Sequence, residues 1–370
     1  MKFLEVPYVA FPQQVAKIKA ELMQAIEAVL DSGMYVMGEK MRQFEREFAT
    51  FCGAKYGAGV ANGTCSLHLV LRGIGVVPGD EVITVPNSFI ASAGAIGVIG
   101  AKPVFIDVCA DLNMDPEQIE LAITPRTKAV MPVHLTGRPA KMDRIMEIAK
   151  AHGLIVVEDA AQAVGASYKG RRVGAMGDAG CFSLHPLKNL HAFGDGGMMV
   201  TNDEALYDRI LMSRNHGLKS RDQCDFWSSN CRLDEMQAAM LQVQLPHLNK
   251  WTEQRRQLAF RYNELLKRYV EVPEEGENEY CVYQTYVVQA NDRDALLEML
   301  KENGVQANVH YPLPLHRQPA ADSLGYREED FPVTEKLATR ILSLPLYPEL
   351  SHGQQDYIAE LFHNFYGKTS

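Results

Sequence analysis

The chain has 370 residues, of which 46% are hydrophobic, so it can bury a sizeable core and divide into two domains. Its formal net charge of −9 argues against nucleic acid or an anionic membrane as the main partner, because both select for a surplus of lysine and arginine. We therefore expect a soluble globular protein, in which local basic pockets remain possible.

The first residues do not have the pattern of a secretion signal. Glu5 and Pro7 interrupt the apolar character of the N-terminus, and no small-residue cleavage site follows. The most apolar stretch, residues 90–108, contains glycines, Lys102 and Asp107, which favours a helix followed by a buried strand over a membrane span. We therefore expect a mature, cytoplasmic protein.

Periodic apolar residues predict the elements of the first 160 residues. Spacing between Pro12 and Gly33 predicts one amphipathic helix over residues 12–32, and a second helix is predicted over residues 41–51. From residue 80, short apolar runs alternate with helical patterns, which predicts a mainly parallel sheet covered by helices on both faces. These segments are EVITVP (81–86), SFIASAGAIGVIG (88–100), PVFIDV (103–108), AVMPVH (129–134), KMDRIMEIAKAHG (141–153) and LIVVED (154–159).

The last third of the sequence predicts a smaller α+β unit. Residues 232–270 have a helical pattern with a break at Pro246, and the polar stretch 271–280 resembles a connection. We divide the chain into a large domain, residues 1–250, and a small C-terminal domain, residues 251–370. The small domain is predicted to contain YQTYVVQA (283–290) as a strand, DRDALLEMLKENG (292–304) as a helix, VQANVHYP (305–312) as a strand and HGQQDYIAELFHNFYG (352–367) as the last helix.

The seven cysteines are odd in number and scattered, and no two are spaced as CxxC. This distribution fits neither a disulfide framework nor a zinc site. We expect reduced, mostly structural thiols and no metal site.

Asp159 ends the predicted strand LIVVED, at the edge of a parallel sheet where ligands gather. Two interpretations stay open. The carboxylate either caps a helix over residues 160–164 or meets a ligand cation, such as the protonated pyridine nitrogen of a cofactor.

Lys188 lies among small, apolar and glycine residues in FSLHPLKNLHAFGDGG. It is either a solvated lysine of a surface turn or the amine that a pyridoxal phosphate cofactor requires for a Schiff base. Gly63 and Thr64 open a helical run after Asn62, which is either an ordinary cap at Thr64 or a phosphate cradle at a helix N-terminus. Carboxylate, lysine and cradle together favour pyridoxal phosphate.

Glycine patterns give little support to a dinucleotide oxidoreductase. The runs at 73–79 and 174–180 lack the GxGxxG spacing between a strand and a helix, and neither a P-loop nor HExxH occurs.

Ordered blocks along nearly the whole chain identify a resemblance to a known family. NGTCSLHLVL, VVEDAAQAVGASYKG, FSLHPLKNL, FGDGGMMVTND, NCRLDEMQAAML and VHYPLPLH resemble blocks of the DegT family of sugar aminotransferases. The resemblance implies a fold-type I pyridoxal phosphate transferase that moves an amino group from L-glutamate to a keto group of a nucleotide-linked sugar. It also implies a homodimer with shared active sites.

The resemblance assigns roles to individual residues. Lys188 would form the internal aldimine, and Asp159 would keep the ring nitrogen protonated. The other cofactor contacts would be Gln162 at the ring hydroxyl, Phe89 stacked on the ring, Gly63, Thr64 and Ser183 at the phosphate, and Asn230 reaching the phosphate from the dimer partner.

Several of these residues have simpler interpretations. Phe89 could pack in the core at a helix start, and Gln162 could be an exposed helix residue. His310 and Tyr311 match the family's block near the sugar nucleotide, although Tyr311 could equally be a packed strand residue. His316 is a weaker candidate.

The acceptor sugar is less well defined. His185 stands where many members have tyrosine or phenylalanine, which leaves substrate details open, and GDGG after the lysine resembles members that act at C3. Three alternatives remain: a 4-keto sugar aminotransferase, a pyridoxal phosphate sugar dehydratase and a non-catalytic regulatory homologue. The presence of Lys188 disfavours the dehydratase.

Overall fold

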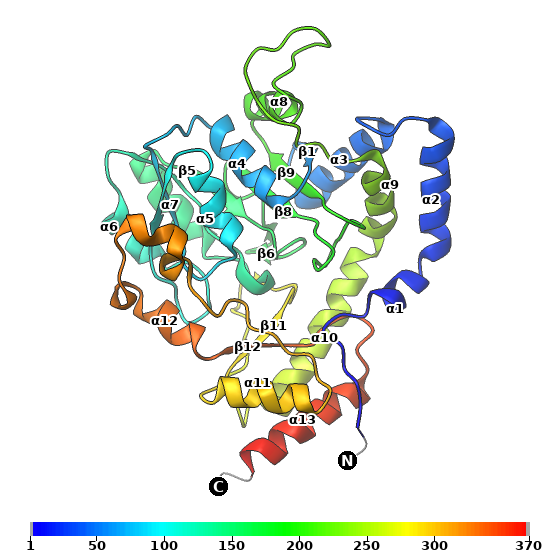
Figure 1. Cartoon of the computed structure of the whole chain (residues 1–370), viewed down its shortest axis with the longest axis vertical. Coiled ribbons are helices and arrows are strands. Elements are labelled where there is room, and N and C mark those ends of the chain that lie inside the picture. Colours follow the sequence, from blue (N-terminus) through cyan, green and yellow to red (C-terminus); the bar gives the residue numbers. More distant parts are fainter. Residues whose placement is uncertain (1–2, 368–370) are drawn as a thin grey trace.

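A seven-stranded sheet organises the larger part of the molecule (Figure 1). This computed structural model describes residues 3–367. The strand order is β1-β9-β8-β5-β4-β2-β3, and only β9 runs antiparallel to its neighbours, so the predicted mainly parallel sheet is confirmed. The strands are β1 (Tyr56–Val60), β2 (Glu81–Thr84), β3 (Lys102–Phe105), β4 (Thr127–Val130), β5 (Ile155–Asp159), β8 (Ala179–Ser183) and β9 (Gly197–Thr201).

Helices cover both faces of this sheet, as the sequence predicts. Successive strand residues point to opposite faces, so Val156 packs in the hydrophobic cluster on one face of the sheet and Val157 in the cluster on the other. One face is covered by α4 (Gly63–Gly73), α5 (Ile90–Gly97) and α8 (Glu204–Ser213), and the other by α3 (Glu39–Cys52), α7 (Met142–His152) and α9 (Glu235–Gln244), with the short α6 (Ile119–Ala122) near α7.

The predicted single helix over residues 12–32 is wrong. The segment forms two helices, α1 (Phe11–Ala16) and α2 (Lys19–Ser32), because Ile18 leaves helical geometry at φ −120° and ψ 8°. The buried Ile18 side chain packs with Met240 and Trp251. The second predicted helix is confirmed as α3.

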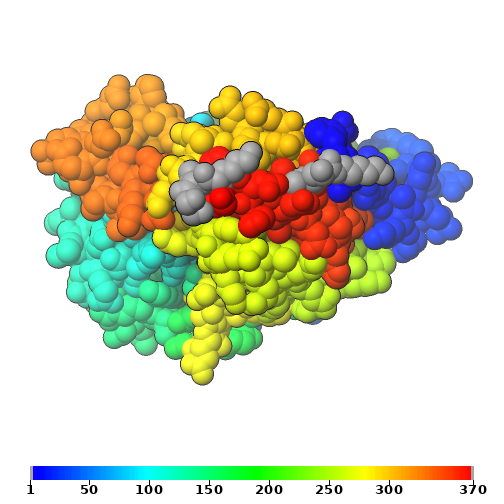
Figure 2. Space-filling view, turned by 90° about the horizontal axis from the view of Figure 1, so that it is seen from below, coloured from blue at the N-terminus to red at the C-terminus, as the bar shows by residue number. Residues whose placement is uncertain are grey.

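The C-terminal unit packs around α10 (Leu248–Leu266), which follows α9 through a short 3-10 turn containing Pro246. Its two-stranded sheet pairs β11 (Tyr286–Gln289) with β12 (Ile341–Leu344). In Figure 2, α13 (His352–Tyr366), in red, lies across the visible surface beside α10 and near the N-terminal segment. The unit also contains α11 (Arg293–Glu302), α12 (Pro332–Ala338) and β10 (Glu279–Tyr280). β10 pairs with β6 (Ser167–Tyr168) of the larger part, and β7 (Arg171–Arg172) completes this small sheet.

Two expectations for the C-terminal unit meet different outcomes. The predicted last helix is confirmed as α13, but residues 305–312 do not form a strand. They make only isolated pairings, Val305 with Val6 and Asn308 with Ser343, because two different chain segments flank them. The division at residue 250 stays a prediction. It falls inside α10, and Val6 from the N-terminus joins the C-terminal core.

None of the helices between residues 3 and 367 combines the length and apolar character needed to cross a bilayer. The apolar stretch 90–108 instead folds as α5 followed by β3, as predicted.

Candidate active site

Three chain segments deliver polar groups to one edge of the sheet. β5 and β8 are parallel, and β1 and β8 both run antiparallel to β9, so β1, β5 and β8 all end at the same edge. Asp159 ends β5, Ser183 ends β8, and Gly63 opens α4 just after β1. The connectivity of the sheet thus gathers residues separated by up to 120 positions.

The N-terminus of α4 lies directly against the end of β8. A Cβ atom added at Gly63 would lie 2.8 Å from the Ser183 Cβ, so this approach requires glycine. Asn62, not Thr64, caps the helix, with its Oδ1 accepting from the Cys65 N–H at 2.8 Å. As the first two helical residues, Gly63 and Thr64 have N–H groups without an intrahelical acceptor, and the Thr64 side chain is exposed. This end of α4 can bind a phosphate.

Asp159 is a buried carboxylate held by neutral donors. Ser92 Oγ donates to its Oδ2 at 2.7 Å, and the Ala161 N–H donates to its Oδ1 at 3.2 Å. Burial raises the pKa of this carboxyl, against the opposing effects of these hydrogen bonds and of Lys188. None of the ion pairs within residues 3–367 includes Asp159. The alternative of a helix cap is wrong, because residues 160–166 contain turns and form no helix.

Lys188 lies in the loop after β8. Some of its surface is accessible to solvent, but the surrounding protein desolvates the amine and lowers its pKa to about 8, although the negative charge of Asp159 opposes this shift. The loop is fixed by Gln284, whose Oε1 accepts from the Asn189 N–H at 2.8 Å and whose Nε2 donates to the Leu187 carbonyl at 2.6 Å. The alternative of an ordinary solvated lysine therefore does not describe this site.

Phe89, Gln162 and Tyr311 form a connected group. The Phe89 ring is 54% exposed at the start of α5 and lies 5.6 Å from the Tyr311 ring, so it is not a core residue. Gln162 is buried outside any helix, with its Oε1 accepting from the Thr136 N–H at 2.8 Å. Its Nε2 donates to the Tyr311 hydroxyl at 3.2 Å. The simpler interpretations of Phe89 and Gln162 are thus wrong.

His310 lies next to this group. Its Nδ1 is 2.8 Å from Ser343 Oγ, and its ring is 5.8 Å from that of Tyr8. Burial, together with the positive charge of Lys188, lowers the pKa of His310 to about 4, so the imidazole is neutral at physiological pH. Burial also raises the pKa of Tyr311 well above its ordinary value.

The other residues named from the sequence lie elsewhere or are exposed. Asn230 is exposed, in the segment between α8 and α9, and its backbone pairs with Asn215 just after α8. His185 is exposed, with its Nδ1 accepting from the Leu187 N–H at 3.2 Å. His316 is buried against Phe331 and Glu335, in a cluster separate from the Lys188 loop.

Sequence reasoning missed the residues that support the site. Ser92, Gln284 and Tyr8 come from three distant segments and have no motif of their own. Glu158 and His134 were also missed. His134 Nε2 lies 2.9 Å from Glu158 Oε2, and the His134 N–H donates to the Asp159 carbonyl at 3.0 Å. The only sequence signal was an acidic residue next to Asp159.

The fold and this edge of the sheet define a fold-type I pyridoxal phosphate enzyme. Residues 16–363 match the DegT/DnrJ/EryC1/StrS aminotransferase family, and the chain belongs to that family. It is therefore a pyridoxal-phosphate-dependent aminotransferase.

Two curated relatives match almost the whole chain. It is 45% identical over 368 residues to a pleiotropic regulatory protein of Geobacillus stearothermophilus, covering 98% of this chain and 99% of that protein. It is 42% identical over 352 residues to dTDP-3-amino-3,4,6-trideoxy-alpha-D-glucose transaminase of Streptomyces venezuelae, covering 94% and 93%.

A solved structure has the same fold. The crystal structure of DesV from S. venezuelae in complex with a ketimine intermediate superimposes with a TM-score of 0.95 at 41% identity and covers 98% of each chain.

Proposed function

We propose that this aminotransferase moves an amino group from L-glutamate to the keto carbon of a nucleotide-linked hexose, with a 3-keto sugar as the preferred acceptor. The observation that carries the proposal is the meeting of a desolvated Lys188, a buried Asp159 and the open N-terminus of α4 at one sheet edge. The name of the S. venezuelae transaminase, a 3-amino sugar enzyme, supports the choice of carbon.

The residues present fit the cofactor. The N–H groups of Gly63 and Thr64 and the Ser183 hydroxyl would bind its phosphate, which the helix dipole of α4 also favours. Asp159, whose pKa is raised by burial, would gain a cationic partner when a protonated ring nitrogen lies against it. When bound, pyridoxal phosphate supplies the electron sink that makes a proton on the amino acid α-carbon removable.

Lys188 is the proposed acid and base of the reaction. Its pKa of about 8 leaves an appreciable neutral fraction at pH 7–8, which an amine needs both to attack a carbonyl and to accept a proton. Asp159 would hold a proton on the ring nitrogen throughout, and the 2.7 Å hydrogen bond from Ser92 fixes the carboxylate for that task.

Neighbouring side chains would orient the two substrates. Phe89 presents an exposed ring that could cover one face of the cofactor, and the Gln162 amide retains one N–H for the ring hydroxyl after donating to Tyr311. His310, neutral and fixed by Ser343, and Tyr311 would contact the sugar nucleotide.

We propose a homodimer in which Asn230 completes the phosphate site of the partner subunit. Asn230 is exposed in the segment between α8 and α9, which is compatible with contact to a neighbouring subunit. Each active site would then need two chains.

A regulatory role is the second candidate, favoured by the name of the G. stearothermophilus relative. A regulatory protein can retain the fold and bind the cofactor without turning over a sugar. Conversion of the bound cofactor by L-glutamate, followed by its return to the starting form on addition of a keto-sugar, would separate the two functions.

The decisive assay uses purified protein, L-glutamate and a matched pair of nucleotide-linked 3-keto and 4-keto hexoses. Mass spectrometry of the sugar should show replacement of the keto oxygen by an amine with the 3-keto compound. Amination of the 4-keto compound alone would overturn the choice of carbon. No amination of either, with the cofactor bound, would favour the regulatory candidate.

A further inference from the structure

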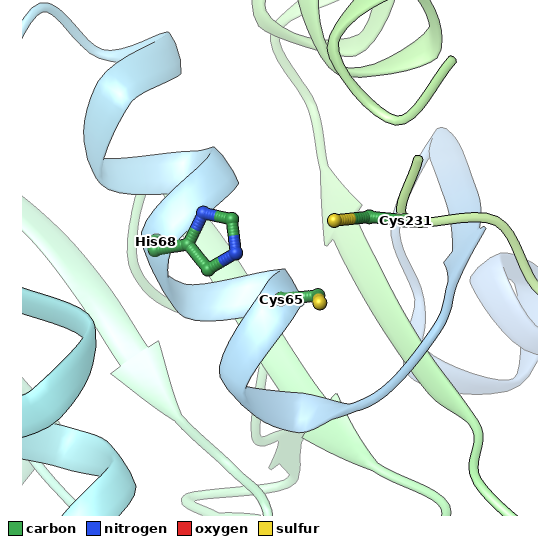
Figure 3. A group of neighbouring side chains, drawn as sticks. All are labelled: Cys65, His68 and Cys231. Atoms are coloured by element: carbon green, nitrogen blue, oxygen red, sulfur yellow. The ribbon is translucent and has the colours of Figure 1, made fainter. Parts of the chain in front are cut away.

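Cys65 and His68, near the N-terminus of α4, meet Cys231, which lies far from both in the sequence. Cys65 and His68 lie three residues apart on one face of the helix, and Cys231 faces them from the segment that leads into α9 (Figure 3). One potential ligand atom from each of the three residues lies within 4.8 Å of the others. Sequence reasoning missed this group because Cys231 lies 166 positions after Cys65, so no local motif joins the three residues.

The backbone holds all three residues in place. The Cys231 N–H donates to the Arg214 carbonyl at 2.9 Å, and its carbonyl accepts from the Ala61 N–H at 3.0 Å. Cys65 is fixed by the hydrogen bond from its N–H to Asn62. A ligand that binds the three side chains therefore meets groups that are already positioned and do not need to be ordered first.

We propose that Cys65, His68 and Cys231 form a binding site for a soft divalent cation, with Zn²⁺ as the natural occupant. Two sulfurs and one imidazole nitrogen are ligands that Zn²⁺ prefers, and three protein ligands leave one tetrahedral position for water. Binding replaces two S–H protons by two metal–sulfur bonds, so two protons are released and no electron is transferred.

The chemistry of the group supports metal binding over simple packing. Cys231 is 5% exposed, whereas Cys65 and His68 retain surface through which an ion can enter. Burial of Cys231 and access through Cys65 and His68 fit an ion bound by all three side chains.

The site is distinct from the proposed cofactor contacts but adjoins them. Cys65 follows Thr64 directly, and Cys231 follows Asn230 directly. A bound ion would tie α4 to the segment before α9. Because the three side chains are separate from the proposed cofactor contacts, metal binding can be measured without an activity assay.

Cobalt(II) is the probe, added to the reduced holoenzyme without oxygen. The cobalt difference spectrum should show sulfur-to-metal charge transfer and strong visible bands at one ion per chain. Cys65→Ser and Cys231→Ser should lose the charge transfer, and His68→Gln should weaken binding by at least about tenfold. Cys224→Ser, which removes an exposed thiol outside the group, should bind cobalt like the parent.

Protection from alkylation provides a second measurement if a variant folds poorly. In the parent protein, Zn²⁺ should protect Cys65 and Cys231 from iodoacetamide while Cys224 stays reactive, as peptide mass spectrometry would show. Equal cobalt binding by Cys65→Ser and the parent would overturn the proposal. A second pair of results would also overturn it: the two cysteines form a disulfide in air, and the reduced protein shows no sulfur-to-cobalt absorption. Cys65 and Cys231 would then be a redox couple and not metal ligands.

Discussion

At the scale of single residues, burial acts on Lys188 and Asp159 in opposite directions. Loss of water favours the neutral form of each, so it lowers the pKa of the amine and raises that of the carboxyl. A cofactor with an aldehyde and a basic ring nitrogen would use both effects.

Borohydride should attach the cofactor permanently to the peptide that contains Lys188. The reagent reduces a carbon–nitrogen double bond to a stable amine, so only the lysine bonded to the cofactor is labelled. Peptide mass spectrometry locates the added mass, and Lys188→Ala, which should still bind the cofactor through its phosphate, supplies the unlabelled control. A label on another lysine would contradict the assignment.

Asp159→Asn should keep the fold but lose most activity, because an amide cannot stabilise a cationic ring nitrogen as a carboxylate does. We expect a loss of about 10²–10³ in kcat, the scale of other single electrostatic deletions. Steady-state kinetics measure the loss, and the melting temperature checks the fold. Near-normal turnover would exclude the proposed role.

The pKa of Lys188 predicts how stability changes with pH in the cofactor-free protein. The folded chain loses this proton near pH 8, whereas the unfolded chain keeps it until about 10.5. The unfolded state therefore binds more protons in this interval, and the free energy of unfolding should rise with pH there by up to about 3 kcal/mol. Denaturant titrations should show this rise relative to Lys188→Met, and parallel pH profiles of the two proteins would refute it.

At the scale of elements, the phosphate cradle depends on how closely α4 approaches β8. No side chain fits between Gly63 and Ser183, since a Cβ at Gly63 would lie 2.8 Å from that of Ser183. The approach brings free N–H groups of the helix beside the Ser183 hydroxyl. Helix and strand thus form one anion site that neither contains alone.

Gly63→Ala should push α4 away from β8, weakening cofactor binding and costing about 1–3 kcal/mol of stability. Gly97→Ala is the matched control, because Gly97 is also helical and nothing lies within 4 Å of an added Cβ. The control should be neutral or slightly stabilising. Fluorescence titration with pyridoxal phosphate and thermal melting compare the two. Equal affinities would show that the close approach is not needed.

At the scale of the whole molecule, the proposed active site needs two subunits. Lys188→Ala and Asn230→Ala should each impair activity as homodimers. Co-expression gives heterodimers in which one site combines an intact Lys188 with an intact Asn230 from the other chain. That site should work, because a phosphate contact supplied across an interface ties cofactor binding to assembly.

Activity of the purified heterodimer, measured against both parents, tests the shared site. If Asn230 served its own chain, both sites of the heterodimer would carry one defect. Activity no higher than that of the parents would then reject the shared site.

The sequence by itself determined the local parts of this protein. Alternation of apolar runs predicted the parallel sheet because buried strands and covering helices have different periods. Lys188, Asp159 and the start of α4 could be named because each lies at the end of a recognisable element or motif. The same periodicity failed at residues 12–32, where packing of Ile18 against α9 and α10 breaks a helix that local spacing would continue.

Only the tertiary structure decided which distant residues meet. Ser92 holds Asp159, Gln284 fixes the Lys188 loop, and Cys231 faces Cys65 across 166 positions. No local pattern encodes these contacts, because they depend on the order of strands in the sheet and on where each loop returns. Periodicity reports which face of an element is buried, whereas chemistry between elements depends on how those faces are assembled.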